Sequence, residues 1–285
     1  MSSNTNSVSP ASPAPPMRRL SFAVAALLLG ALLLRLTEAD LPLFRGLNAL
    51  AAALPDTLWS GLSVLGLGLS IGLVGLALSP GRERGAMRLI NALMWAFPLG
   101  GLLSHVPKRV FVQLRPPGVL PPEQLHVIGD PLVHLAMPSG HALAAFAFVW
   151  VLLHTRQCTA AQRALLWGTA AAVGLSRIAV GAHWPSDVLA GAALGLVAAA
   201  LSLRAAQRWD LSGLLTRRRA QAGMALVQVG AGLAMLWTTT GYPLGAPLQW
   251  ALGLAGVAGG LLRLRWVAVP AVSGRRSGWM AERAG

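Results

Sequence analysis

The stretch "SRIAVGAHWPSD" (residues 176–187) joins two long apolar runs. It places three ionisable side chains, Arg177, His183 and Asp187, at the edge of segments apolar enough to lie in a membrane. An ionisable group at such a position is costly and usually marks a function. The stretch therefore predicts two membrane helices with a functional site where they meet.

The composition indicates a membrane protein. Of the 285 residues, 55% are hydrophobic and only 11% are charged, and the mean hydropathy is +0.60. A soluble domain carries about 25% charged residues. The single cysteine, Cys158, excludes an internal disulfide, and we interpret it as an inert small residue.

Eight apolar runs approach the length of about 17–25 residues that crosses the hydrocarbon core as a helix. They lie at about 20–34, 57–79, 89–106, 138–154, 164–181, 187–203, 222–238 and 246–262. Segments of this kind satisfy their backbone groups inside a membrane as helices. The predicted fold is therefore all-α, a polytopic transmembrane helical bundle. The first run, followed by "TEA", also fits a cleaved signal peptide, but we expect an uncleaved span.

The basic residues predict the orientation of the bundle. With the N-terminus inside, 17 of the 23 basic residues fall in cytoplasmic loops and tails, as the positive-inside rule expects. The formal charge of +14 is thus a topology signal and not a nucleic-acid-binding surface. Arginine supplies all but one of the 23, a bias that suggests a bacterium with GC-rich DNA, and we expect an inner-membrane protein with both termini cytoplasmic. Six basic residues remain on the outer side: Arg35, Arg45, Lys108, Arg109, Arg115 and Arg177.

The chain divides into five predicted parts. They are a disordered tail at 1–17, a membrane core at 18–205, a basic cytoplasmic loop at 206–221, two additional transmembrane helices at 222–264 and a basic tail at 265–285. The first tail is rich in Ser, Pro and Asn, which disfavours a packed structure. The sequence leaves open the role of the last two spans and the oligomeric state.

Two outer loops carry a predicted phosphate-binding site. Lys108 and Arg115 come from "KRVFVQLRP" and Arg177 from the stretch quoted first, and an arginine fork can hold a phosphate through two hydrogen bonds. Ser139 and Gly140 belong to "PSGH" at the start of the fourth predicted span. Free backbone N–H groups at the start of a helix favour an anion, and glycine permits its close approach.

Two histidines and a carboxylate complete the predicted site. Pro185 fits the first turn of the sixth span, so that His183 precedes the helix and Asp187 lies in its first turn. Asp187 can then orient the imidazole and stabilise it when charged. We expect His183 to be the nucleophile and His141 to protonate the leaving oxygen.

The motifs KxxxxxxRP, PSGH and SRxxxxxHxxxD are all complete here, so the chain resembles the type-2 phosphatidic acid phosphatase superfamily over about residues 85–205. This superfamily includes integral-membrane lipid phosphatases and soluble vanadium haloperoxidases. The resemblance implies a six-span helical core and a phosphohistidine intermediate on His183, supported by Asp187, with His141 as general acid. It also implies that the phosphate is held by Lys108, Arg115, Ser139, Gly140 and Arg177, and that no metal or other cofactor is required.

The resemblance predicts an enzyme that hydrolyses a lipid phosphomonoester or pyrophosphate at the outer face of the membrane. Among lipids, family analogy favours undecaprenyl pyrophosphate, with phosphatidylglycerophosphate or phosphatidic acid next. Three alternatives stay open: a transferase that passes the phosphoryl group to lipid A, a haloperoxidase that holds vanadate, and a non-catalytic membrane protein. The expected partners are a lipid phosphate and the membrane, with no nucleic acid.

Overall fold

The computed structural model describes residues 17–81 and 83–268, and these residues fold into helices and connecting loops without a strand. The helices are α1 (Met17–Leu36), α2 (Asp40–Ala51), α3 (Asp56–Leu65), α4 (Gly68–Ala77), α5 (Arg84–Phe111), α6 (Gly140–Thr155), α7 (Ala160–Ala179), α8 (Pro185–Arg208), α9 (Ser212–Leu215), α10 (Arg218–Trp237) and α11 (Ala246–Ala268). Three short 3₁₀ turns, η1 (Pro116–Gly118), η2 (Pro122–Gln124) and η3 (Pro243–Gly245), lie in the loops. The predicted all-α class is confirmed. The predicted tails, except Met17 and residues 265–268, lie outside the described residues.

Each of the eight apolar runs is helical, but not every helix is long and apolar enough to cross a membrane. Five described helices meet that condition on their own: α1, α5, α8, α10 and α11. The pair α3 and α4 qualifies only when both are taken together, and it is bent by 69°. Helix α6 has 16 residues, and α7 carries arginines at both ends that lower its hydropathy. The structure thus gives a polytopic bundle with five or six candidate spans, fewer than the eight predicted.

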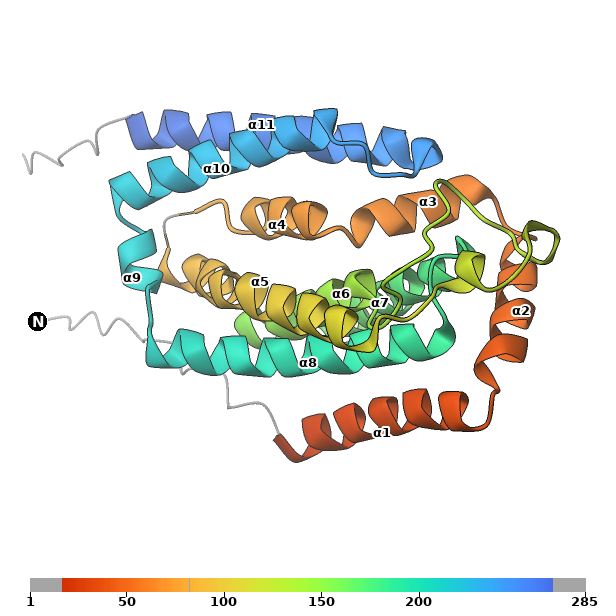
Figure 1. Ribbon diagram of the computed structural model, residues 1–285. Coiled ribbons are helices and arrows are strands. Elements are labelled where there is room, and N and C mark those ends of the chain that lie inside the picture. The colour runs from red at the N-terminus through yellow and green to blue at the C-terminus, as the bar shows by residue number, and fades with distance from the viewer. Residues whose placement is uncertain (1–16, 82, 269–285) are drawn as a thin grey trace, which may run out of the picture.

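Helix α8 lies at the centre of the bundle and packs against α1, α5 and α6 (Figure 1). The approach of α6 is very close, because a Cβ atom at Gly191 would collide with the carbonyl oxygen of Ser139 and one at Gly195 with that of Leu143. Small residues permit such backbone contact between membrane helices. The same contact brings the N-terminal ends of α6 and α8 together, and the Ser139 N–H donates to the Asp187 carbonyl oxygen (2.9 Å).

The C-terminal helices α10 and α11 form an antiparallel hairpin that covers α3 and α4 (Figure 1). The loop at its tip, including η3, lies at the same end of the bundle as α2 and the long loop between α5 and α6. The hairpin is therefore packed on the predicted core rather than tethered beside it.

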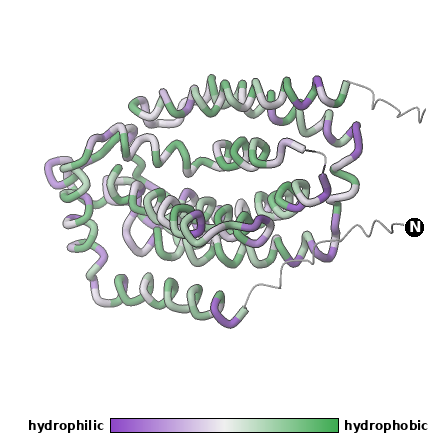
Figure 2. The backbone as a smooth tube through the Cα atoms, turned by 180° about the vertical axis from the view of Figure 1, so that it is seen from behind, coloured by the Kyte–Doolittle hydropathy of each residue, from purple (hydrophilic) through white to green (hydrophobic). Residues whose placement is uncertain are grey.

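Hydrophobic residues predominate along the length of the helices, and hydrophilic residues gather at the two ends of the bundle (Figure 2). On α1, Leu29, Leu32 and Leu36 are more than half exposed, as are Leu254 and Trp266 on α11. A water-soluble protein rarely exposes so much contiguous apolar surface. The distribution is that of a bundle whose sides face lipid.

Three local features differ from the prediction. Helix α5 continues to Phe111, so Lys108 lies in its last turn and not in a loop. Helix α7 ends at Ala179, inside the predicted run 164–181, so Arg177 lies in its last turn and not in the outer loop. Helix α2 was not predicted, since it is short and its apolar residues are interrupted by polar ones. All three features lie at the end of the bundle that holds the candidate site.

Candidate active site

The predicted site residues gather at one end of the bundle, around a cavity of about 550 Å³. Six of the eight line it: Lys108, Arg115, Gly140, His141, Arg177 and His183. The other two, Ser139 and Asp187, are completely buried directly behind it. The structure therefore brings together residues from three separate motifs, which α5, α6, α7 and α8 deliver to the same place.

The first turn of α8 holds His183 against Asp187. Helix α8 begins at Pro185, and one carboxylate oxygen of Asp187, Oδ2, accepts a hydrogen bond from the Trp184 backbone N–H (2.9 Å). The same oxygen lies 3.4 Å from His183 Nδ1. Both side chains are buried, His183 with 2% of its surface exposed. The carboxylate is thus fixed by the helix and faces the imidazole edge that points away from the cavity.

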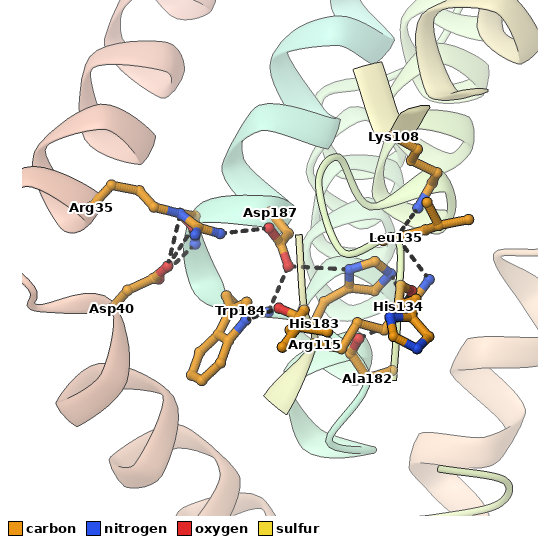
Figure 3. A network of polar contacts seen from close by, with 12 residues as sticks. Arg35, Asp40, Lys108, Arg115, His134, Leu135, Ala182, His183, Trp184 and Asp187 are labelled. Atoms are coloured by element: carbon orange, nitrogen blue, oxygen red, sulfur yellow. Dashed lines mark hydrogen bonds and ion pairs between the residues drawn. The ribbon is translucent and has the colours of Figure 1, made fainter. Parts of the chain in front are cut away.

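Arg115 contacts the other nitrogen of the imidazole. Its Nη1 lies 3.1 Å from His183 Nε2 (Figure 3). A guanidinium can only donate, so Nε2 is the acceptor, and the ring proton is assigned to Nδ1, facing Asp187. Burial, followed by the charges of Arg115 and Arg177, holds the pKa of His183 well below its usual range. The arrangement leaves a neutral ring with a lone pair on Nε2 directed at the cationic side of the site.

The three predicted cations are held by backbone and side-chain oxygens. Lys108 Nζ donates to the Leu135 carbonyl oxygen (2.8 Å), and Arg115 Nε donates to that of His134 (2.8 Å). Arg177, of which 1% is exposed, donates through Nη1 to Ser63 Oγ (2.6 Å). None of these oxygens carries a full negative charge. The site therefore keeps a large positive potential, suited to an anion of two charges.

Three buried polar atoms of the site have no hydrogen-bonding partner among the described residues. They are Ser139 Oγ, His141 Nε2 and Arg177 Nε. Buried polar atoms are nearly always paired, so each such atom calls for an explanation. Ser139 and His141 flank the N-terminus of α6, where free backbone N–H groups also favour an anion. A phosphoryl group in the cavity would supply oxygens for these donors.

An ion pair that the sequence did not predict lies behind Asp187. Arg35, near the end of α1, places Nη2 2.9 Å from Asp187 Oδ1 and donates through Nε to Ser186 Oγ (2.8 Å). Asp40, at the start of α2, accepts from the Ser186 N–H (2.9 Å) and pairs with Arg35 Nε at 3.4 Å (Figure 3). The only indication in the sequence was that Arg35 is a basic residue on the outer side. Like the site cations, Arg35 lies on the predicted outer side, where the positive-inside rule disfavours basic residues.

The inner part of the cavity is an apolar slot between α4, α5 and α6. Helix α5 lines it with one stripe at helical spacing: Leu93, Ala96, Phe97, Gly100, Gly101, Ser104, His105 and Lys108. At 1.5 Å per residue, the stripe from Leu93 to Lys108 is about 22 Å long. Small residues on α6, Gly140 and Ala144, form part of the facing wall. The slot has the length and the lining to accept a hydrocarbon chain whose polar end lies among the cations.

Comparison with known proteins gives a consistent result. Residues 89–210 match the family model described as the PAP2 superfamily. The lipid A 1-phosphatase of Rhizobium johnstonii is 32% identical over 113 residues, which cover 36% of this chain and 42% of the relative. The lipid A 1-phosphatase of Rhizobium etli is 35% identical over 105 residues, covering 33% and 40%. The chain thus matches less than half the length of these curated relatives.

A solved structure was also found. The crystal structure of Aquifex aeolicus LpxE aligns with a TM-score of 0.48 and 31% sequence identity, covering 57% of this chain and 94% of that chain. The family match at residues 89–210 includes all eight predicted site residues, but it ends before α10.

Proposed function

The chain belongs to the PAP2 superfamily, and from this premise we propose that it is an integral-membrane phosphatase acting on a lipid phosphate. One observation carries the proposal. Three cations line the cavity together with His183, three buried polar atoms of the site have no partner among the described residues, and the rest of the cavity is an apolar slot. A water-soluble phosphate ester lacks the hydrocarbon chain that an apolar slot would bind.

The proposed reaction begins with attack of His183 Nε2 on phosphorus. A bond between Nε2 and phosphorus forms as the bond from phosphorus to the lipid oxygen breaks. Arg115 Nη1, which donates to Nε2 in the free site, turns to a phosphoryl oxygen, and Asp187 stabilises the imidazole as it becomes positively charged. Lys108 and Arg177 neutralise the developing charge, as positioned cations do in phosphoryl transfer.

His141 is placed to complete both half-reactions. His141 lines the cavity, and its Nε2 has no partner among the described residues. Once the bound phosphate offsets the neighbouring cations, the ring can be protonated and can give that proton to the departing lipid oxygen. The resulting neutral ring can then take a proton from a water molecule that attacks the phosphohistidine. Inorganic phosphate leaves, and both histidines return to their starting state. The sequence of steps needs only residues that line or lie behind the cavity.

The substrate is proposed from the relatives and from the slot. Both curated relatives are named lipid A 1-phosphatases, so a phosphate on a lipid A disaccharide is the first candidate. Undecaprenyl pyrophosphate, which the sequence favoured by family analogy, is the second, followed by phosphatidylglycerophosphate and phosphatidic acid. All four join a phosphate to long hydrocarbon chains. A transferase that uses lipid A as acceptor would share the same site residues.

We further propose that the site faces the outer side of a bacterial inner membrane. The cavity lies at the end where α5 and α7 finish, and the opposite end carries exposed arginines such as Arg84, Arg163 and Arg208. Arginine-rich ends remain in the cytoplasm. Both described termini, the start of α1 and the end of α11, lie at that arginine-rich end (Figure 1). A cysteine-accessibility assay on intact cells would test this orientation.

The test of function is phosphate release by the full chain, purified in detergent and assayed in EDTA. The four lipids named above are compared, with His183→Ala as the inactive variant and His154→Ala, at the far end of α6, as the matched control. We expect release from one lipid class, lost in His183→Ala and retained in His154→Ala. Release that requires a divalent metal, or that persists in His183→Ala, would refute the mechanism. Release only after a lipid acceptor is added would identify a transferase.

A further inference from the structure

The tip of the C-terminal hairpin is fixed against the site end of the bundle. The Asp130 N–H donates to the Gly241 carbonyl oxygen (3.3 Å). The two backbone segments approach so closely here that a Cβ atom at Gly129 would collide with the same oxygen. At the other end of the hairpin, buried Arg263 donates to the carbonyl oxygens of Leu76 (3.0 Å) and Ser79 (2.6 Å). The hairpin is held at both ends, so its loop has a defined position beside the cavity.

That loop delivers Tyr242, the single tyrosine of the chain, to the candidate phosphate site. Tyr242 is 6% exposed, and its hydroxyl oxygen accepts a hydrogen bond from Arg177 Nη2 (2.6 Å). The Arg177 guanidinium carbon also lies 5.1 Å from the centre of the tyrosine ring, within the range of a cation–π contact. Arg177 is thus clamped between Ser63 of α3 on one side and the hairpin on the other.

The hydroxyl of Tyr242 has a second capacity that these contacts do not use. A phenol is both an acceptor and a donor. Its oxygen accepts from Arg177, but no acceptor for its own proton is found among the described residues. Tyr242 lines the same cavity as Arg177 and His183. The free O–H group and the unpaired Arg177 Nε therefore both belong to the wall of the site.

We propose that Tyr242 is a phosphate-binding residue contributed by the C-terminal hairpin. Its hydroxyl accepts from Arg177, which fixes the guanidinium, and donates its proton to an oxygen of the bound phosphoryl group. This inference rests on the proposed function, because it assigns Tyr242 to the same anion site. It also gives a role to helices that the sequence left unassigned and that lie beyond the family match.

The test compares the binding of inorganic phosphate to the full-length wild type, Tyr242→Phe and Trp237→Phe, by isothermal titration calorimetry in detergent. Tyr242→Phe keeps the ring, and with it the packing and the cation–π contact, but removes the hydroxyl. Trp237 lies in the same hairpin and is 79% exposed, so Trp237→Phe is the matched control. We expect the dissociation constant for phosphate to rise at least about fivefold in Tyr242→Phe, as for the loss of a hydrogen bond to a charged ligand.

The outcomes separate the inference from the function on which it rests. Weaker phosphate binding in Tyr242→Phe, with an unchanged unfolding temperature and an unchanged control, supports the inference. Equal dissociation constants would overturn it, as would a lower unfolding temperature without a change in binding, and so would a wild type that binds no phosphate. If the wild type binds phosphate but releases none from any lipid, the proposed hydrolysis fails while the role of Tyr242 is still decided by the dissociation constants.

Discussion

Arg35 Nη2 lies 2.9 Å from Asp187 Oδ1, and Asp187 Oδ2 lies 3.4 Å from His183 Nδ1, so a residue of the first helix is linked to the proposed nucleophile through one carboxylate. The two residues of the ion pair are 152 positions apart in the chain. Asp187 is completely buried, whereas Arg35 keeps about a quarter of its side chain accessible. Removal of Arg35 would leave a buried carboxylate with fewer partners, which is costly.

We therefore expect Arg35→Gln to lower kcat about tenfold, because Asp187 loses a charge-assisted hydrogen bond of about 1.5 kcal/mol and supports a cationic His183 less well. The apparent KM should change little, since Arg35 does not line the cavity. Steady-state kinetics on the preferred lipid would measure both values. Arg45→Gln is the control, because Arg45 lies on the same side and its side chain donates to Gln124 Oε1 (2.6 Å), away from Asp187. An unchanged kcat in Arg35→Gln would remove the ion pair from the mechanism.

Substitution of Asp187 should separate binding from chemistry. Asp187→Asn keeps the size of the side chain but cannot stabilise an imidazolium, so formation of the phosphohistidine should slow by about a hundredfold or more. Binding of inorganic phosphate should remain within about threefold of the wild type, because Asp187 lies behind the cavity and not in its wall. Rapid-quench labelling with a radioactive lipid phosphate would give the rate. A normal labelling rate would show that Asp187 is not needed.

The pH dependence of the nucleophile follows from its surroundings. Burial and the nearby Arg115 and Arg177 lower the pKa of His183, so the ring should stay neutral as the pH falls below about 6.5, the usual value for histidine. It should become protonated, and lose its nucleophilic lone pair, only at more acidic pH. NMR of histidine-labelled protein without substrate, with the signal assigned by His183→Gln, would follow this titration. A midpoint at or above 6.5 would contradict the environment described here.

The contact between α6 and α8 should be sensitive to a single methyl group. Gly191→Ala places a Cβ atom against the Ser139 carbonyl oxygen, which would force the two helix starts apart at a cost of about 1–3 kcal/mol. We expect a lower unfolding temperature together with weaker phosphate binding. Gly230→Ala is the matched control, because nothing lies within 4 Å of a Cβ atom at that exposed helical position. Equal effects of both substitutions would mean that the close approach is not required.

The fold class and the predicted site residues were accessible from the sequence because both depend on local patterns. Apolar runs of helical length predict membrane helices wherever they occur. The break between α3 and α4 was not visible, since Gly66, Leu67 and Gly68 continue the apolar run and hydropathy does not register a bend. Helix α2 was missed for the opposite reason, because it is too short and too polar to resemble a span.

The contacts of Arg35, Ser63 and Tyr242 could not be predicted, because they join distant segments that no motif connects. Arg177 and Ser63 are 114 positions apart, and Arg177 and Tyr242 are 65 apart. A single serine or tyrosine carries no pattern of its own. Only the packing of α3 and of the C-terminal hairpin on the bundle reveals that Ser63 and Tyr242 both contact the Arg177 guanidinium.

With the proposed lipid phosphate bound, the slot along α5 would limit the length of the hydrocarbon chain that fits. In the proposed complex the phosphate lies at Lys108, and each turn of the helix below it corresponds to about 5.4 Å of hydrocarbon chain. Ser104, Gly100 and Ala96 follow one another down this scale, and Leu93 marks its lower end. Such a slot would select lipids by the length of the tail, independently of the head group. A larger side chain at Ala96 would shorten the scale from below and leave the phosphate site untouched.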